Sequence, residues 1–223
     1  MPQTDLVLGD LTPHQLLRLQ DLELAPRYVE KLKRFRYGPG VFKIDYALSC
    51  PIPWAASECS RAATIHIGGS LEEIIEAERT LDSERPFVLL GQPSLFDPTR
   101  APSRSHTAWA YCHVPNGSSI DYTEAIEKQI SRFAPNFRDC ILARSVSTPA
   151  ALEQWNPNLV GGDILGGSMN LRQLIYRPTS ELYRTSKRAY ISVGLPRRRE
   201  VVCMGWLAIM QLTLHSLTWG SNE

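Results

Sequence analysis

Residues 41–48 read Val-Phe-Lys-Ile-Asp-Tyr-Ala-Leu, and their pattern is the clearest indication of the fold class. Every second residue from Phe42 onward is large and apolar, whereas Lys43, Asp45 and Ala47 stand between them. A period of two predicts a β-strand with one buried face. We expect the strand to end before Pro51, because proline has no amide hydrogen for a sheet.

Strand and helix patterns alternate along the rest of the chain. Further strands are expected at residues 63–67, 86–91, 107–114, 141–147 and 189–193. Helices are expected within residues 10–36, after Ser70, after Asp121, after Thr148 and at residues 201–217. This interleaving predicts a mixed α and β fold of the α+β class, with helices packed on a sheet.

Three helix starts carry recognisable signals. Ser70-Leu-Glu-Glu73 matches a capping box, Asp121 and Glu124 resemble a second one, and Thr148 precedes Pro149 at a first helical position. The first helix is expected to bury Leu71, Ile74, Ile75 and Leu81, and the second Tyr122, Ile126, Ile130 and Phe133.

The composition excludes several classes of protein. The chain has 223 residues, of which 43% are hydrophobic and 21% charged, so wholesale disorder is excluded. Twenty-four Lys and Arg against 23 Asp and Glu give a net charge of +1. No global positive field exists, so we expect no nucleic-acid partner.

Cysteine usage and apolar segments bear on the cellular compartment. Five cysteines, at positions 50, 59, 112, 140 and 203, include no Cys-x-x-Cys spacing, and we interpret them as reduced thiols. The first residues lack a signal-peptide pattern, which predicts a cytoplasmic protein. Residues 201–217 are apolar but short for a membrane span and contain Gln211 and His215, so we expect a buried helix there.

Few residues in the sequence are candidates for catalysis. Cys112 and His113 are neighbours on an expected strand and therefore point to opposite faces, which argues against a catalytic dyad. His66 and His106 lack acidic or cysteine neighbours at ligand spacing, so each is interpreted as structural and no metal site is expected. The catalytic residues are left unassigned.

A glycine-rich segment at residues 160–172 is the most informative stretch for binding. It contains two Gly-Gly pairs around Asp163, and such pairs allow a ligand or another chain segment to approach the backbone closely. A ligand site and a tightly folded turn are equally compatible with these residues. No Gly-x-Gly-x-x-Gly occurs anywhere in the chain, so the usual cradle for a dinucleotide pyrophosphate is absent.

Several stretches together resemble a known family. They are residues 45–48, 51–54, 64–73, 86–89, 91–94, 97–102, 106–111, 113–117, 132–135 and 161–173. They resemble the C-terminal half of FAD-dependent oxidoreductases of the phytoene desaturase type. The chain is also similar to bacterial relatives of the pyridine nucleotide-disulfide oxidoreductase domain-containing proteins.

The resemblance implies a two-part fold of the amine oxidase-like kind. Residues 1–115 would form mostly a substrate-binding domain with a mixed sheet, and residues 116–223 would return to a Rossmann-like FAD domain. The cofactor would be FAD, and the reaction a hydride transfer from a carbon of a small, apolar substrate. Peripheral contact with a membrane is compatible with such a substrate. The residues implied near the flavin are Gly161, Gly162, Asp163, Gly166 and Gly167, together with Gly205 at the last helix.

The sequence departs from this family in two ways. The N-terminal nucleotide motif is absent, and residues 195–203 read Leu-Pro-Arg-Arg-Arg-Glu-Val-Val-Cys where relatives have a glycine-rich run. We therefore predict a truncated gene with a compensated frameshift, and weak or absent FAD binding by this chain alone. The alternatives are a non-catalytic interaction module, a subunit that associates with a separately encoded N-terminal half, or an inactive gene product.

Overall fold

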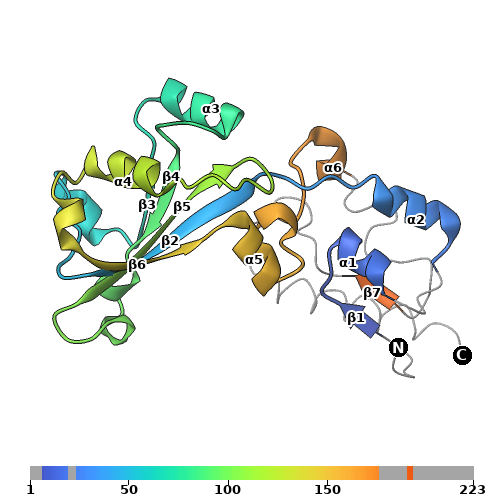
Figure 1. Ribbon diagram of the computed structural model, residues 1–223, viewed down its shortest axis with the longest axis horizontal. Coiled ribbons are helices and arrows are strands. Elements are labelled where there is room, and N and C mark those ends of the chain that lie inside the picture. The colour runs from blue at the N-terminus through green and yellow to red at the C-terminus, as the bar shows by residue number, and fades with distance from the viewer. Residues whose placement is uncertain (1–6, 20–23, 176–189, 193–223) are drawn as a thin grey trace, which may run out of the picture. The chain divides into compact units, whose positions relative to one another are not determined.

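The computed structural model describes residues 7–19, 24–175 and 190–192 (Figure 1). Internal contacts divide the chain into two compact units. The sheet unit comprises residues 39–164, and the terminal unit comprises residues 1–38 and 165–223. The sheet unit includes residues from both sides of position 115, and the assignment of residues 1–115 and 116–223 to two functional domains stays a prediction.

The sheet unit is built on five strands. They are β2 (Gly40–Leu48), β3 (Thr64–Ile67), β4 (Val88–Gly91), β5 (His106–Val114) and β6 (Ile141–Ser147). Their order is β3-β4-β5-β2-β6, and every neighbouring pair is antiparallel. The predicted strands and the mixed α and β class are therefore confirmed.

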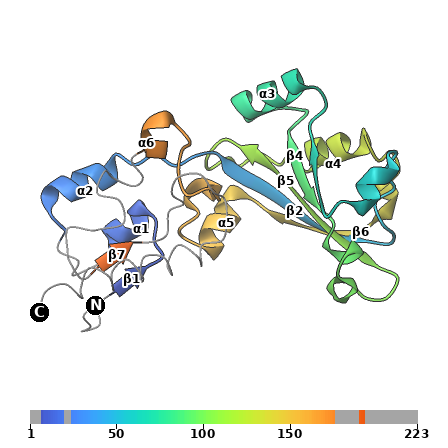
Figure 2. The ribbon, with the colours of Figure 1, turned by 180° about the vertical axis from the view of Figure 1, so that it is seen from behind.

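Three helices and five short 3-10 turns complete the sheet unit. The helices are α3 (Leu71–Thr80), α4 (Thr123–Ser131) and α5 (Pro149–Trp155). The 3-10 turns are η1 (Ser57–Arg61), η2 (Pro93–Leu95), η3 (Pro98–Arg100), η4 (Phe137–Cys140) and η5 (Val160–Gly162). Helix α4 lies along one face of the sheet, as two opposite views show (Figures 1 and 2).

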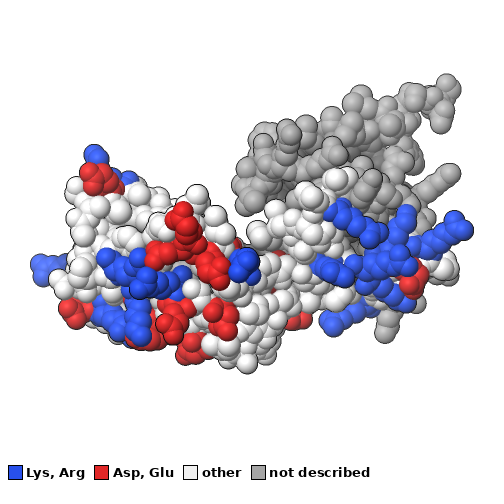
Figure 3. Space-filling view, turned by 90° about the horizontal axis from the view of Figure 1, so that it is seen from above, with Lys and Arg blue, Asp and Glu red and all other residues white. Residues whose placement is uncertain are grey.

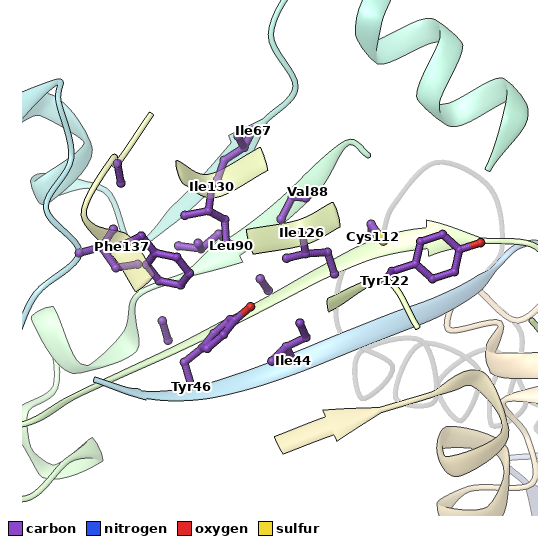
Figure 4. Packing of buried hydrophobic residues seen from close by; sticks show 14 of the residues in the cluster. Ile44, Tyr46, Ile67, Val88, Leu90, Cys112, Tyr122, Ile126, Ile130 and Phe137 are labelled. Carbon is purple, nitrogen blue, oxygen red and sulfur yellow. The ribbon is translucent and has the colours of Figure 1, made fainter. Parts of the chain in front are cut away.

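The core fills the space between α4 and this inner face of the sheet. Figure 4 shows Ile44 and Tyr46 of β2 pointing toward Ile126 and Ile130 of α4. Phe137 of η4 packs edge-on against the Tyr46 ring, with centroids 5.3 Å apart. The predicted alternation along β2 is confirmed, because its large apolar residues are buried while Lys43 and Ala47 are not.

The predicted capping box at α3 is confirmed. The Glu73 amide donates to the Ser70 hydroxyl at 3.3 Å, and the Ser70 amide donates to the Glu73 carboxylate at 3.2 Å. The predicted apolar face of this helix is wrong for Leu71 and Ile75, which are 66% and 57% exposed, whereas Ile74 and Leu81 are half-buried. Polar contacts also hold the helix, because Glu73 pairs with Arg85 and Arg132.

The predicted start of α4 differs in detail. Asp121 accepts the Thr123 amide at 2.8 Å, but Glu124 pairs with Arg138 at 2.7 Å instead of returning to the helix start. Phe133 is exposed, contrary to expectation, because α4 has already ended at Ser131. The Thr148 cap of α5 is confirmed, since its hydroxyl accepts the Ala151 amide.

The terminal unit contains short elements. They are β1 (Val7–Gly9), α1 (Pro13–Arg18), α2 (Pro26–Lys33), α6 (Leu171–Ile175) and β7 (Tyr190–Ser192). Strands β1 and β7 pair in parallel. Leu16, Tyr28 and Leu32 form a small buried cluster between α1 and α2. The helical stretch expected at residues 10–36 is thus divided, and Pro26 begins its second part because proline suits a first helical position.

Basic side chains gather over α2, as Figure 3 shows. The residues are Arg27, Lys31, Lys33, Arg34 and Arg36, and all are exposed. Lys31 and Lys33 lie in the last helical turn, where positive charge is favoured by the helix dipole.

Among the described residues, no helix is long and apolar enough to cross a membrane. The helix expected at residues 201–217 lies outside the part of the chain that the structure describes.

Candidate functional site

The outer face of the sheet, opposite α4, carries a row of aromatic rings on β5. Trp109, Tyr111 and His113 alternate with buried Ala110 and Cys112 and are themselves half-buried. The Trp109 and Tyr111 rings are stacked, with centroids 6.1 Å apart and planes 9° apart. The His113 ring lies 6.0 Å from that of Tyr111. We call these three residues the aromatic stripe.

Gly91 lets the Trp109 ring lie close over β4. The two residues face each other in the β4–β5 pairing. A Cβ at position 91 would overlap atoms of the indole ring, so only glycine leaves Trp109 this position. The Trp109 ring thus occupies the space that a side chain at position 91 would take.

Charged groups border the aromatic stripe on two sides. His113 Nδ1 lies 2.9 Å from a Glu78 carboxylate oxygen of α3, and the Lys43 ammonium pairs with Asp45 on β2. Burial, followed by the Glu78 charge, raises the pKa of the Tyr111 phenol, so this group stays a neutral hydrogen-bond donor at physiological pH. The surface therefore combines an apolar centre with a polar edge.

The glycine-rich loop is folded tightly against the sheet unit. Gly161 and Gly162 have φ angles of 63° and 81°, which favour glycine. A Cβ at Gly40 would overlap the Gly161 carbonyl oxygen, so β2 and the loop need glycine where they meet. Asp163 is fully buried.

The amides of this loop donate within the chain. The Gly161 amide donates to Glu153 at 2.8 Å, the Gly162 amide to the Leu159 carbonyl at 2.9 Å, and the Asp163 amide to the Val160 carbonyl at 3.3 Å. Donors that are already paired do not bind an anionic group. The glycines therefore allow the loop to pack closely against the sheet unit, but the three amides are not available to bind an anion.

The remaining predicted site residues lie elsewhere. Gly166 and Gly167 belong to the terminal unit, are buried and have φ angles of 64° and 140°. Gly205 lies outside the described residues. The structure brings Gly161, Gly162 and Asp163 together, and the role of all six residues near a flavin stays a prediction.

The histidines considered in the sequence each contact a neighbouring side chain. Cys112 is buried on the inner face and His113 lies on the outer face, as predicted. The His66 ring packs edge-on against Phe87, and His106 Nδ1 lies 3.3 Å from the Ser94 hydroxyl. Within residues 7–19, 24–175 and 190–192, no group of three or more His, Cys, Asp or Glu side chains is arranged to hold a metal ion.

Ser94 and His106 line a small pocket at one end of the sheet. The pocket is lined by Leu48, Pro51, Ile52, Gln92, Ser94, Leu95, His106, Thr107 and Ala108. The Ser94 hydroxyl accepts the Thr107 amide at 3.0 Å. This bond fastens the long loop between β4 and β5 to the start of β5, so the serine has a structural role.

A buried carboxylate on α4 was not foreseen from the sequence. Glu127 is 3% exposed and makes ionic contacts with Arg144 at 2.7 Å and Arg138 at 3.3 Å. Burial, followed by this charge, raises the pKa of the Tyr46 phenol. Because both arginines reach solvent, the cluster is best explained as a link between α4, η4 and β6.

The aromatic stripe was also missed, although a signal for it existed. The period of two along residues 107–114 assigns Trp109, Tyr111 and His113 to one face. Trp109 and Tyr111 entered only through the family resemblance of residues 106–111, and the faces of this strand were considered only for Cys112 and His113. The contribution of Gly91 required the pairing register, which one sequence does not provide.

Comparisons with known proteins find distant oxidoreductase relatives. No protein-family model matches this chain. Pyridine nucleotide-disulfide oxidoreductase domain-containing protein 2 is 33% identical in Rattus norvegicus and 31% identical in Mus musculus, each over 118 residues. The match covers 48% of this chain and 20% of each relative, so it spans about a fifth of the relatives' length.

One solved structure is similar over most of the chain. A crystallised oxidoreductase from Methanosarcina mazei matches 93% of this chain and 43% of its own, with 13% sequence identity and a TM-score of 0.48.

Proposed function

We propose that this chain forms the substrate-facing part of a flavin-dependent oxidoreductase, with the aromatic stripe as a wall of the substrate site. The observation that carries the proposal is the row of half-buried Trp109, Tyr111 and His113 rings on the outer face of the sheet. The distant similarity to a pyridine nucleotide-disulfide oxidoreductase domain-containing protein supports the redox class. The phytoene desaturase type, with its hydride transfer from a substrate carbon, belongs to the same proposal.

The chemistry of the surface favours an apolar substrate with a polar end. Aromatic faces bury large apolar areas and stack against flat or unsaturated groups. Tyr111 and His113 offer hydrogen-bonding groups at the border of that area. Substrate binding and orientation are therefore the steps we assign to these residues, and no catalytic acid or base is assigned.

FAD is the cofactor that we propose for the assembled enzyme, where it would accept the hydride. The loop Gly161–Asp163 fits this cofactor only in part, because its three amides already donate within the chain. Gly166, Gly167 and Gly205 stay candidates for close approach. The parallel pairing of β1 with β7 supports a flavin-domain role for the terminal unit, since Rossmann-like sheets are parallel.

Binding of an apolar dye tests whether the aromatic stripe forms a wall of the substrate site. Diphenylhexatriene fluoresces in apolar surroundings, so titration of the full chain should give saturable binding. We expect Trp109→Ala to weaken that binding by about fivefold, because one aromatic partner of about 1 kcal/mol is lost. The matched control is Trp155→Ala, since Trp155 is 80% exposed on α5.

Equal binding by the wild type and both variants would refute the assignment of the stripe. A flavin measurement tests the cofactor part separately. We expect the purified chain to bind FAD weakly or not at all, and a yellow protein with stoichiometric flavin absorbance would refute this expectation. A cytoplasmic location also stays part of the proposal.

A second candidate function is that of a subunit completed by a separately encoded flavin-binding partner. Edge strand β6 favours it, because Leu142 is 62% exposed and Val146 39% exposed there. Exposed apolar groups on an edge strand favour association. Sizing the chain alone and with such a partner tests this, and a folded monomer that ignores the partner would contradict it.

A further inference from the structure

Two cysteines far apart in the sequence meet at one end of the sheet. Cys50 follows β2, and Cys140 closes η4 just before β6. Their sulfur atoms are 2.7 Å apart although the residues are separated by 90 positions. A disulfide bond is about 2.05 Å long, so a small movement would bring the sulfurs to bonding distance.

The backbone holds the two cysteines in place. The Ser49 amide donates to the Cys140 carbonyl at 2.8 Å, and Leu48 stands opposite Ile141 in the β2–β6 pairing. The Ser49 hydroxyl donates to the same carbonyl at 3.2 Å. The sulfurs therefore meet because two paired strands bring them together, and a side-chain rotation alone does not separate the residues.

The two thiols differ in their access to solvent. Cys50 is half-buried, whereas Cys140 is 5% exposed. Burial and the adjacent Cys50 thiol raise the pKa of Cys140 to about 11, so Cys140 is held as a neutral thiol. An oxidant from solvent reaches Cys50 first, and Cys140 is the neighbour that can react with the oxidised sulfur.

We propose that Cys50 and Cys140 form a reversible thiol–disulfide site that responds to peroxide. Hydrogen peroxide oxidises the Cys50 thiolate to a sulfenic acid and releases hydroxide. The Cys140 sulfur then attacks the Cys50 sulfur, and the sulfenic hydroxyl leaves with the Cys140 proton as water. In total, two thiols and one peroxide give one disulfide and two waters.

The bond would have a structural effect at the neighbouring pocket. It would tie the end of β2 to η4 and close a long loop, which stabilises a chain by restricting its unfolded state. Leu48, Pro51 and Ile52 flank Cys50 and line the small pocket beside Ser94. This inference does not rest on the proposed oxidoreductase function.

The test uses the reduced full chain treated with a small excess of hydrogen peroxide. We expect the intact mass to fall by about 2 Da through loss of two hydrogens, with reversal by dithiothreitol. A non-reducing peptide map should show Cys50 joined to Cys140. The oxidised chain should melt about 5–10 °C higher than the reduced one.

Variants separate this site from other cysteine chemistry. Cys50→Ser should abolish the mass loss and the rise in melting temperature, and the matched control Cys59→Ser should retain both, because Cys59 is also half-buried. A bridge to Cys59, Cys112 or Cys203 would overturn the proposal. Accumulation of sulfinic acid at Cys50 without a bridge in the wild-type chain would overturn it as well, whether or not a variant folds.

Discussion

Single residues fix the candidate surface, and Gly91 is the clearest of them. Gly91→Ala places a methyl group where the Trp109 ring lies. We expect a loss of about 1–3 kcal/mol in the free energy of unfolding, as for an overpacked site. Urea denaturation measures the loss. In the Trp109→Ala background the same substitution should cost much less, and an equal cost in both backgrounds would contradict the proposed overlap.

Glu73 contributes to the acid sensitivity of α3. Hydrogen bonds from Arg132 and Arg85, and from the Ser70 amide, lower the pKa of the Glu73 carboxyl below its usual 4.5. A lowered folded-state pKa stabilises the fold above pH 4.5, and this contribution is lost as the pH falls through the folded value. The Glu73→Gln variant should therefore lose less free energy of unfolding than the wild type as the pH falls below 4.5.

Denaturant unfolding at several pH values between about 3 and 6 checks this expectation. The matched control is Glu76→Gln, whose side chain pairs with the exposed Arg79 on the same helix. An unchanged pH dependence in Glu73→Gln would contradict the role given to Arg132 and Arg85.

At the scale of elements, α4 provides the apolar cover of the inner sheet face. Ile130 is fully buried. Ile130→Ala should lower the free energy of unfolding by about 2–5 kcal/mol, because it removes buried methyl groups and leaves a cavity. The control Ile120→Ala, at a residue that is 50% exposed, should change it by less than about 0.5 kcal/mol. Similar losses from both would contradict the described packing.

The elements were largely predictable because local signals decide them. The period of two at β2 and the capping box at Ser70 each act within a few residues. The exposure of Leu71 and Ile75 on α3 was not predictable, because their spacing fits an apolar helix face that would pack on a sheet. Contacts between segments far apart in the chain decide which helix covers the sheet. A single sequence does not show those contacts.

The site was less predictable than the fold. The glycine pairs drew attention to residues 161–167, and the structure shows that Gly161 and Gly162 meet steric needs of the loop itself. The aromatic stripe depends on Gly91, and the thiol pair depends on the β2–β6 register. Both features arise from strand pairing, which periodicity within one strand cannot specify.

At the scale of the whole molecule, the sheet unit contains its own core. Its five strands, α4 and the main buried cluster all lie within residues 39–164. We therefore expect a fragment of residues 39–164 to fold and to unfold cooperatively on heating. Calorimetry and near-ultraviolet circular dichroism measure this, and a fragment without a cooperative transition would contradict the division into units.

Binding of an apolar substrate by the aromatic stripe is the proposal on which the assigned function depends. Photolabelling of the full chain with an alkyl benzophenone tests this binding, because peptide mapping reports where the probe lies. We predict saturable labelling within β5, between His106 and Val114, and in the adjoining β4. Labelling confined to exposed Leu71 and Ile75 of α3, or spread without saturation over the chain, would contradict the claim.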